Sequence, residues 1–142
     1  MKIPFPLKTA IIDDNRTILK LMDVILEDEN ELDIEYFLDP NEALEAIKSN
    51  QFHLVITDIN MPELCGDMLV RKIMDLRLGI DIIVMTGGIN LIDAYACFKA
   101  GAKEIVFKPI DKIKLICSIN ESIEKFKKWN NVLDHIIKQK NI

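Results

Sequence analysis

Short apolar runs alternate with longer segments of helical periodicity along this chain of 142 residues, and this alternation constrains the fold more than any other feature. Several of the runs are almost continuously apolar, which is typical of parallel strands covered on both faces. The predicted strands are Thr9–Ile12, Asp33–Leu38, Leu54–Thr57, Asp81–Met85 and Glu104–Phe107. Because strands that alternate with helices are joined by right-handed crossovers, the pattern predicts an α/β fold with a doubly wound parallel sheet.

The segments between the strands carry the signals of helices. Ile18–Leu26 contains an apolar stripe at helical spacing. Asp39 and Pro40 form a helix start, in which the first side chain caps the helix and the proline fits its first turn. Asn90 and Asp93 indicate the start of the fourth helix. A fifth helix follows the last strand and runs long.

Charge and composition argue against several classes of protein. With 18 Lys and Arg against 23 Asp and Glu, the chain has a net charge of -5, which disfavours a general nucleic-acid-binding protein. Cys65, Cys97 and Cys117 lie far apart and form no cluster with histidine, so reduced thiols are expected rather than zinc ligands. No apolar run approaches the length of a membrane span and the N-terminus lacks a signal-peptide pattern, so a cytoplasmic protein is expected.

Polar residues follow four of the predicted strands at the points where those strands end. Because the carboxyl ends of parallel strands lie at one edge of the sheet, where ligands bind in open α/β folds, these residues are expected to converge. They are Asp13, Asp14, Asp58, Thr86, Gly87 and Lys108. Each one alone has an ordinary interpretation as a helix cap, a turn residue or a surface lysine. Their joint occurrence at successive strand ends indicates a functional site.

The chemistry of this set points to a phosphoryl site that uses magnesium. Three clustered carboxylates repel one another and cannot all stay ionised unless a cation joins them. Oxygen ligands with room for water favour Mg²⁺ over zinc. Lys108 supplies a second positive charge, and backbone N–H groups near Gly87 can donate hydrogen bonds to phosphoryl oxygens. An aspartate can itself take a phosphoryl group and form an acyl phosphate.

The motifs that contain these residues, taken together, resemble the signature of response-regulator receiver domains. The matching motifs are Asp13-Asp14, Ile56-Thr57-Asp58-Ile59-Asn60-Met61-Pro62, Gly66, Met85-Thr86-Gly87-Gly88 and Phe107-Lys108-Pro109. The resemblance extends from about Lys8 to Lys125. It implies a flavodoxin-like, five-stranded parallel sheet in the order 2-1-3-4-5 with five helices, the last one extended.

The resemblance also implies a function in two-component signal transduction. Asp58 would accept a phosphoryl group from the phosphohistidine of a sensor histidine kinase or of a histidine phosphotransfer protein. The domain would switch protein–protein contacts rather than act as an enzyme, and would catalyse only its own phosphorylation and dephosphorylation. Lys108 would contact the phosphoryl group, and the Thr86 hydroxyl would turn to meet it. A cis peptide bond is implied between Lys108 and Pro109.

The metal ligands are implied in the same way. Mg²⁺ would be held by Asp14, Asp58 and the backbone carbonyl of Asn60. Asp13 would act mainly through a water molecule.

The switch position departs from the family pattern. Three residues before Lys108, where receiver domains usually carry Tyr or Phe, this chain has Ile105. An aliphatic side chain has no phenolic hydroxyl that could exchange partners. We therefore expect Thr86 to move on phosphorylation, while the surface near Ile105 changes mainly through backbone shifts in the region of the fourth helix.

Two other functions share parts of this site. A small phosphohydrolase also uses an aspartate nucleophile, but it usually needs a general acid two residues later, where this chain has Asn60. A flavodoxin-like binding module needs a phosphate loop after the first strand, where Asp13 and Asp14 would repel a flavin phosphate. A stand-alone receiver that signals by protein contact is preferred over both, and we expect it because no output domain of useful length follows Lys125. The alternative within the same family is a fragment of a larger regulator or hybrid kinase.

The last predicted helix continues beyond the receiver domain. We predict a receiver domain over residues 1–125 and a C-terminal helical extension over residues 126–142, helical to about Lys138. A heptad seam on this helix contains Phe126, Asn130, Leu133 and Ile137. A buried Asn in such a seam favours a parallel pair in one register, so a homodimer through this helix is expected. The competing arrangement is a tail that folds back onto the domain's own surface.

Overall fold

Five parallel strands form one sheet in the order β2-β1-β3-β4-β5 in the computed structural model, which describes residues 1–88 and 91–140. The strands are β1 (Leu7–Ile12), β2 (Leu32–Phe37), β3 (Leu54–Asp58), β4 (Asp81–Thr86) and β5 (Glu104–Phe107). The predicted fold class and strand order are confirmed, and every strand begins and ends within two residues of its predicted bounds.

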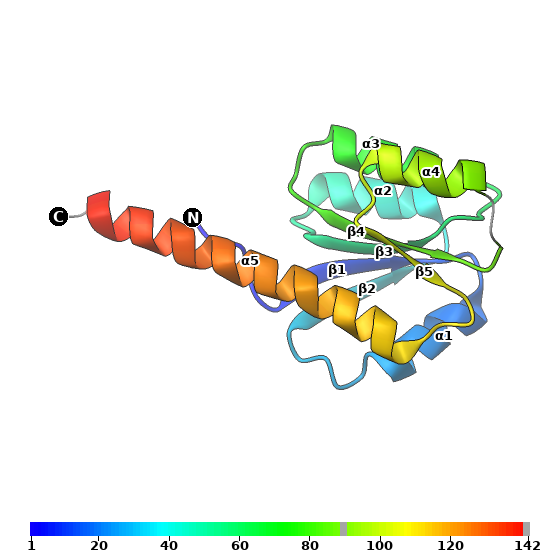
Figure 1. Ribbon diagram of the computed structural model, residues 1–142, viewed down its shortest axis with the longest axis horizontal. Helices are drawn as coiled ribbons and strands as arrows, with labels where there is room; N and C mark the ends of the chain where they lie inside the picture. The colour runs from blue at the N-terminus through cyan, green and yellow to red at the C-terminus, as the bar shows by residue number, and fades with distance from the viewer. Residues whose placement is uncertain (89–90, 141–142) are drawn as a thin grey trace.

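Helices cover both faces of this sheet. They are α1 (Arg16–Ile25), α2 (Pro40–Ser49), α3 (Gly66–Asp75), α4 (Leu91–Ala100) and α5 (Lys112–Lys140). Figure 1 shows α2, α3 and α4 on one face and α1 and α5 on the other, with α5 continuing far beyond the body of the domain. The predicted cap of α2 is confirmed, because the Asp39 side chain accepts a hydrogen bond from the Asn41 N–H at 2.8 Å. Asn90, part of the predicted start of α4, lies outside the described residues.

The strands divide their side chains between two hydrophobic clusters, one on each face of the sheet. In β4, Ile82 and Val84 belong to the cluster under α2, α3 and α4, whereas Ile83 and Met85 belong to the cluster under α1 and α5. All five residues of β3 are buried, because β1 and β4 flank this strand and helices cover both of its faces. The nearly continuous apolar runs in the sequence reflect this burial on two sides.

The register of the central strands brings their carboxyl ends to one edge of the sheet. Thr57 of β3 pairs with Ile12 of β1, so Asp13, the residue after Ile12, lies beside Asp58. Asp58 in turn pairs with Met85 of β4. The ends of three neighbouring strands therefore meet where the sequence predicts the site.

A polar network fixes α5 against the amino-terminal ends of β4 and β5. The ammonium group of Lys103 donates to the Ser118 carbonyl and, at 3.1 Å, to Ser122 Oγ. Ser122 Oγ donates to Asp81 Oδ2 at 2.6 Å, and Lys125 forms an ion pair with the same carboxylate. Ser118 and Ser122 are buried, so their polar groups need these partners. The helix is thus held in one position before it leaves the domain body.

The first six residues, here called the N-terminal strap, contact the part of α5 that leaves the body. The Ile3 backbone N–H donates to Asn130 Oδ1 at 2.7 Å, and Asn130 Nδ2 donates to the Ile3 carbonyl at 2.9 Å. Lys2 forms an ion pair with Asp134 at 3.1 Å, one turn further along the helix. The side-chain amide of Asn130 is therefore bonded within its own chain. It is not free to pair with a second helix, as the heptad pattern predicted.

The extended last helix is confirmed, because α5 continues to Lys140. Phe126, the first residue of the predicted extension, is buried in the cluster under α1 and α5, so the helix is still part of the core at that point. The boundary predicted after Lys125 stays a prediction. Within the described residues, no helix is both long and apolar enough to cross a membrane.

Asn130→Ala should lower the free energy of unfolding by about 1–2 kcal/mol, because it leaves the two polar backbone groups of Ile3 without their partners in a partly buried place. Urea denaturation measures this change. In a chain that lacks residues 1–3, the same substitution should have almost no effect. An equal loss of stability in both chains would show that Asn130 does not act through the strap.

Candidate functional site

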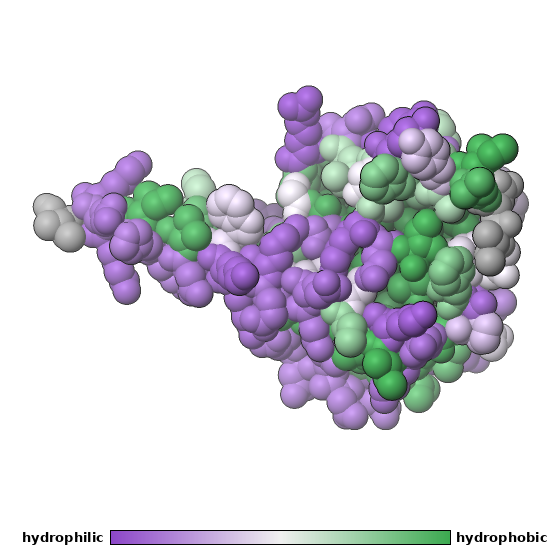
Figure 2. Space-filling view, in the orientation of Figure 1, coloured by the Kyte–Doolittle hydropathy of each residue, from purple (hydrophilic) through white to green (hydrophobic). Residues whose placement is uncertain are grey.

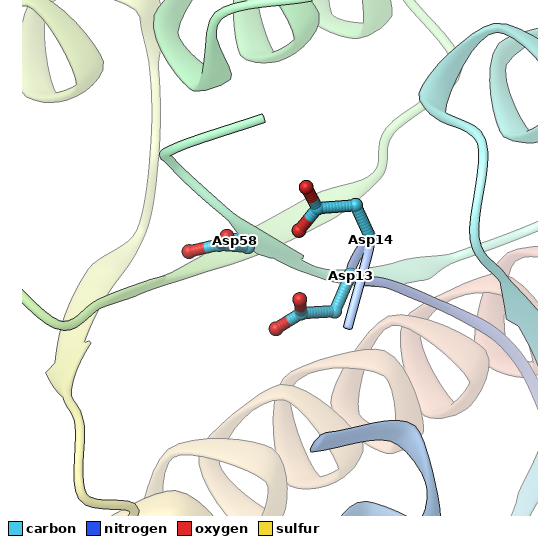
Figure 3. A group of neighbouring side chains, drawn as sticks. All are labelled: Asp13, Asp14 and Asp58. Atoms are coloured by element: carbon cyan, nitrogen blue, oxygen red, sulfur yellow. The ribbon is translucent and has the colours of Figure 1, made fainter. Parts of the chain in front are cut away.

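Three carboxylates converge at the carboxyl edge of the sheet. Asp13 and Asp14 follow β1 and Asp58 ends β3, and Figure 3 shows their side chains grouped around the ends of these two strands. Each offers a carboxylate oxygen, and these oxygens lie within 4.8 Å of one another. Asp13 and Asp58 are buried, whereas Asp14 is exposed to solvent. The structure thus brings together the acidic residues that the sequence singled out.

Lys108 balances part of this negative charge. Its ammonium nitrogen lies 2.9 Å from Asp13 Oδ2 and 3.3 Å from Asp58 Oδ1. The backbone places this lysine, because its N–H donates to the Thr86 carbonyl at 2.7 Å and the predicted cis peptide bond joins it to Pro109. Sequence reasoning missed the ion pair with Asp13, since strand order alone does not tell which carboxylate the ammonium group meets.

Asp13 has a partner on each of its two carboxylate oxygens. Oδ2 pairs with Lys108, and Oδ1 accepts a hydrogen bond from the Asn15 backbone N–H at 3.0 Å. Asp13 is also the most deeply buried of the three acids. This arrangement favours an indirect role for Asp13 at a metal site, and leaves the carboxylates of Asp14 and Asp58 as the more accessible oxygen donors.

Burial and mutual repulsion shift the pKa values of the site. Burial raises the pKa of Asp58 above its ordinary value, although the ammonium group of Lys108 acts in the opposite direction. The pKa of Asp14, although this side chain is exposed, is also raised, by partial desolvation of its carboxylate and by the neighbouring Asp13 carboxylate. Burial lowers the pKa of Lys108, but the Asp13 and Asp58 carboxylates outweigh that effect and the net shift is upward. Lys108 pairs with two of the three carboxylates, so a further cation would relieve the remaining repulsion.

The donor set fits a small, hard divalent cation. The cluster consists of carboxylates alone, whereas zinc sites in proteins are built mainly from Cys and His ligands. Mg²⁺ prefers one or two carboxylates and keeps several water ligands, and Asp14 faces solvent. Asn60, whose backbone carbonyl is the predicted third ligand, is an exposed residue directly after the buried Ile59. The residues present are therefore able to hold Mg²⁺.

The end of β4 provides a hydroxyl group at the same edge. The Thr86 hydroxyl donates to the Gly88 carbonyl at 2.5 Å, and the Gly88 backbone N–H donates to Thr86 Oγ1 at 3.3 Å. A Cβ added at Gly87 would lie 3.7 Å from Cδ of Lys108, so this glycine packs along the lysine side chain. Thr86 and Gly87 thus adjoin Lys108, while the phosphoryl-binding role of the Gly87 N–H stays a prediction.

The predicted switch position borders a cavity. Ile105 is partly buried and, together with Thr86, Ala94 and Phe107, lines a cavity of about 220 Å³. Phe107 lies on the same side of β5 as Ile105, because side chains alternate along a strand, and it is 52% exposed. Sequence reasoning named Phe107 only as part of a motif and gave it no role, although its spacing of two residues from Ile105 could have indicated that it lies beside the switch position. The cavity beside Thr86 is therefore lined at the switch position by the aliphatic side chain of Ile105.

Comparison with known proteins gives a consistent result. The family model described as the response regulator receiver domain matches residues 9–120 of the chain. A solved structure, the CheY-like response regulator receiver domain protein from Methanospirillum hungatei, is 30% identical in sequence. It superposes with a TM-score of 0.80 and covers 86% of this chain and 97% of that chain.

Curated relatives are longer than this chain. Regulatory protein VanR from Enterococcus faecium is 30% identical over 125 residues, which make up 88% of this chain and 53% of that protein. Transcriptional regulatory protein FlgR from Helicobacter pylori is 34% identical over 113 residues, which make up 80% of this chain and 29% of that protein. The chain therefore spans about half or less of the length of these relatives.

Lys108→Met should raise the pKa of Asp58 further, because the substitution removes the positive charge that opposes the effect of burial. Carbon-13 NMR of the Asp58 carboxyl group as a function of pH measures the shift. Lys72→Met removes an exposed lysine from α3 and should leave this titration unchanged. A pKa of Asp58 that stays the same or falls in the Lys108 variant would contradict the role given to the ammonium group.

Asp14→Asn should raise the melting temperature at pH 7 in the absence of metal. Folding raises the pKa of Asp14, so its ionised form destabilises the folded state at neutral pH, and the difference between variant and parent should vanish below about pH 4. Mg²⁺ should raise the melting temperature of the parent chain, because it binds the native state, and most of this rise should be lost in the variant. Thermal scans with and without Mg²⁺ measure both effects.

Asp75→Asn, which changes an exposed carboxylate of α3, is the matched control and should keep the full response to Mg²⁺. An Asp14→Asn variant with the same response to Mg²⁺ as the parent would exclude Asp14 as a ligand.

Proposed function

The chain belongs to the family of response regulator receiver domains, and we propose that it works as a Mg²⁺-dependent switch whose phosphoryl acceptor is Asp58. The position of the Asp58 carboxylate carries this proposal. It is buried, it lies 3.3 Å from the ammonium nitrogen of Lys108, and it clusters with the carboxylates of Asp13 and Asp14. A nucleophilic carboxylate, a fixed positive charge and ligands for a cation are the groups that phosphoryl transfer to an aspartate needs.

Transfer begins with the ionised Asp58 carboxylate. One carboxylate oxygen attacks the phosphorus atom of a phosphohistidine, and the new P–O bond forms as the P–N bond to the imidazole breaks. The imidazole nitrogen keeps the electron pair of the broken bond and takes up a proton. Lys108 already contacts Asp58, so its ammonium group is placed to hold a phosphoryl oxygen once the carboxylate has become an acyl phosphate.

Mg²⁺ would be held by Asp14, Asp58 and the Asn60 backbone carbonyl. When bound, it would neutralise charge on the phosphoryl group during transfer. Asp13 contributes in a different way. Its ion pair with Lys108, at 2.9 Å, keeps the ammonium group over the site while Asp58 is modified. The exposed side of Asp14 gives the phosphodonor and water access to the same edge of the sheet.

Thr86 transmits the modification in this proposal. Its hydroxyl bonds to the backbone of Gly88, and a charged phosphoryl oxygen on Asp58 is a stronger acceptor than a neutral carbonyl. A turn of the hydroxyl towards the phosphoryl group would release its hydrogen bond to Gly88 and change the backbone that directly follows β4. Because Ile105 is aliphatic, we expect this backbone change to carry the signal in place of a turning aromatic ring.

The partner that supplies the phosphoryl group is a sensor histidine kinase or a histidine phosphotransfer protein, and we place the domain with it in the cytoplasm. The chain catalyses only its own phosphorylation and dephosphorylation. A phosphohydrolase is disfavoured because Asn60 cannot act as a general acid, and a flavin-binding module because Asp13 and Asp14 would repel its phosphate.

Output by protein contact is favoured over binding of nucleic acid, since the chain carries a net charge of -5. FlgR is by name a transcriptional regulatory protein, but this chain covers only 29% of it. Self-association through α5 is part of the proposal, because apolar residues of this helix remain exposed beyond the domain body.

Asp58→Asn should abolish phosphorylation by acetyl phosphate, because the amide keeps the shape of the side chain and removes the nucleophile. Mass spectrometry of the intact chain in the presence of Mg²⁺ measures the added phosphoryl group. Asp67→Asn, which changes a carboxylate of α3 outside the cluster, should still be labelled. Stable, stoichiometric labelling of the Asp58 variant would show that another residue is the acceptor.

Ile105 should keep its rotamer when Asp58 carries an acyl-phosphate mimic, while resonances of Thr86 and Gly88 shift. The reason is that an aliphatic side chain has no polar group to exchange partners as the Thr86 hydroxyl turns. Methyl NMR of Ile105 and Thr86 with and without the mimic measures both changes. A rotamer flip of Ile105 coupled to the movement of Thr86 would contradict this account of the switch.

A further inference from the structure

An apolar stripe remains exposed on the part of α5 that projects from the domain. Trp129, Val132, Ile136 and Ile137 are 54%, 46%, 45% and 39% exposed. Their spacing of three and four residues places them, with the half-buried Leu133, on one face of the helix. Figure 2 shows hydrophobic side chains on this projecting helix between hydrophilic ones. A continuous apolar stripe of this length indicates a contact with another protein surface.

This stripe differs from the seam that the heptad pattern predicts. At 3.6 residues per turn, Trp129 and Ile136 lie at the centre of the exposed face, and Phe126 and Asn130 lie at its edge. That edge is already occupied, because Phe126 packs in the core and Asn130 binds Ile3 of the N-terminal strap. The exposed face is therefore rotated around the helix axis relative to the predicted heptad seam. Because Asn130 lies outside its centre and is already bonded, it does not favour a parallel pair.

The stripe leads into a hollow at the base of the projecting helix. The hollow has a volume of about 290 Å³, and its apolar walls include Ile3, Leu78, Phe126 and Trp129. Trp129 belongs to both the stripe and the hollow. A second helix that packs along the stripe would therefore end over the hollow and could place an apolar side chain in it.

Within the described residues, the tail of the same chain does not reach back to this hollow. α5 is one continuous helix to Lys140, so its last apolar residues lie away from the body. Ile136 is about 10 Å along the axis from Trp129, at a rise of about 1.5 Å per residue. The tail of a second copy has no such restriction, and its tip carries the exposed Ile136 and Ile137.

The charge distribution decides between the two possible orientations of such a pair. Residues 125–140 contain five lysines and one aspartate, a net charge of +4, whereas residues 1–124 contain 13 Lys and Arg against 22 Asp and Glu, a net charge of -9. A parallel pair would hold two basic tails together and far from both acidic bodies. An antiparallel pair brings each basic tail closer to the body of the other copy, whose net charge is negative, and at long range this is the more favourable arrangement.

We propose that the exposed stripe of α5 pairs in antiparallel orientation with the same stripe of a second copy, and that an isoleucine from the tip of each tail enters the hollow beside Trp129 of the other. This inference rests on the self-association included in the proposed function, but it does not require phosphorylation of Asp58. Because the stripe covers only about three turns of helix, the dimer should depend on protein concentration.

Sedimentation equilibrium of the full chain tests the surface. Trp129→Ala and Ile136→Ala should each raise the dissociation constant of the dimer by about tenfold or more. The reason is that both side chains lie in the middle of the exposed helix face and point towards the second helix. Val24→Ala truncates an equally apolar residue, 61% exposed on α1, and should leave the constant unchanged. A monomer at every concentration, or a dimer that neither tail substitution weakens, would overturn the proposal.

A distance between spin labels tests the orientation. If the pair is centred on Leu133, labels at Gln139 of the two copies are about 20 Å apart in an antiparallel dimer and about 10 Å apart in a parallel one, from the helical rise and the usual distance between packed helices. The labels are placed in a chain whose three cysteines have been replaced and which still forms the dimer. The shorter distance would overturn the antiparallel arrangement.

Asp58→Asn separates this inference from the proposed phosphorylation. The variant should form the same dimer with the same dissociation constant, even though it cannot be phosphorylated. Conversely, Ile136→Ala should still accept a phosphoryl group on Asp58, because the stripe is far from the carboxyl edge of the sheet. A loss of the dimer in Asp58→Asn would contradict the independence of the two properties and assign dimer formation to the phosphorylation site.

Discussion

Repulsion among three carboxylates is the constraint around which the functional edge of this domain is built. Asp13, Asp14 and Asp58 lie within reach of one another, and Lys108 is the ammonium group that pairs with two of them. Desolvation first, and repulsion from Asp13 second, raise the pKa values of Asp14 and Asp58, so Lys108 does not fully offset the cost of their charges. In the proposed function, incomplete compensation would give the site its affinity for a cation, and a cation together with Lys108 would let the edge receive a phosphoryl group.

The two ends of the sheet have different tasks in this account. At the carboxyl end, buried central strands hold the carboxylates and the lysine in a fixed arrangement, because the register of β1, β3 and β4 places them. At the amino end, α5 is tied to β4 and β5 through Ser122 and Asp81, and Asn130 binds the N-terminal strap. The projecting helix in Figure 1 therefore has a defined direction, which a surface for assembly requires.

Much of the fold and of the site could be predicted from the sequence, because both depend on local patterns that topology then brings together. The apolar runs predicted the strands, and the polar residues that follow these runs predicted the site around Asp58. The pairing of Lys108 with Asp13 could not be predicted, since it depends on side-chain positions across neighbouring strands. The heptad position of Asn130 predicted contact with a second helix, whereas its side chain bonds to Ile3. Ile3 is 127 residues away in sequence, and no sequence motif marks it as a partner.

Chemical trapping of the phosphorylated residue tests the central claim most directly. The chain is treated with acetyl phosphate and Mg²⁺, the acyl phosphate is reduced with borohydride to a homoserine residue, and the modified position is identified by peptide mass spectrometry. The account predicts homoserine at position 58, dependent on Mg²⁺. Homoserine at another acidic position, or the same yield at position 58 after removal of Mg²⁺ by a chelator, would contradict it.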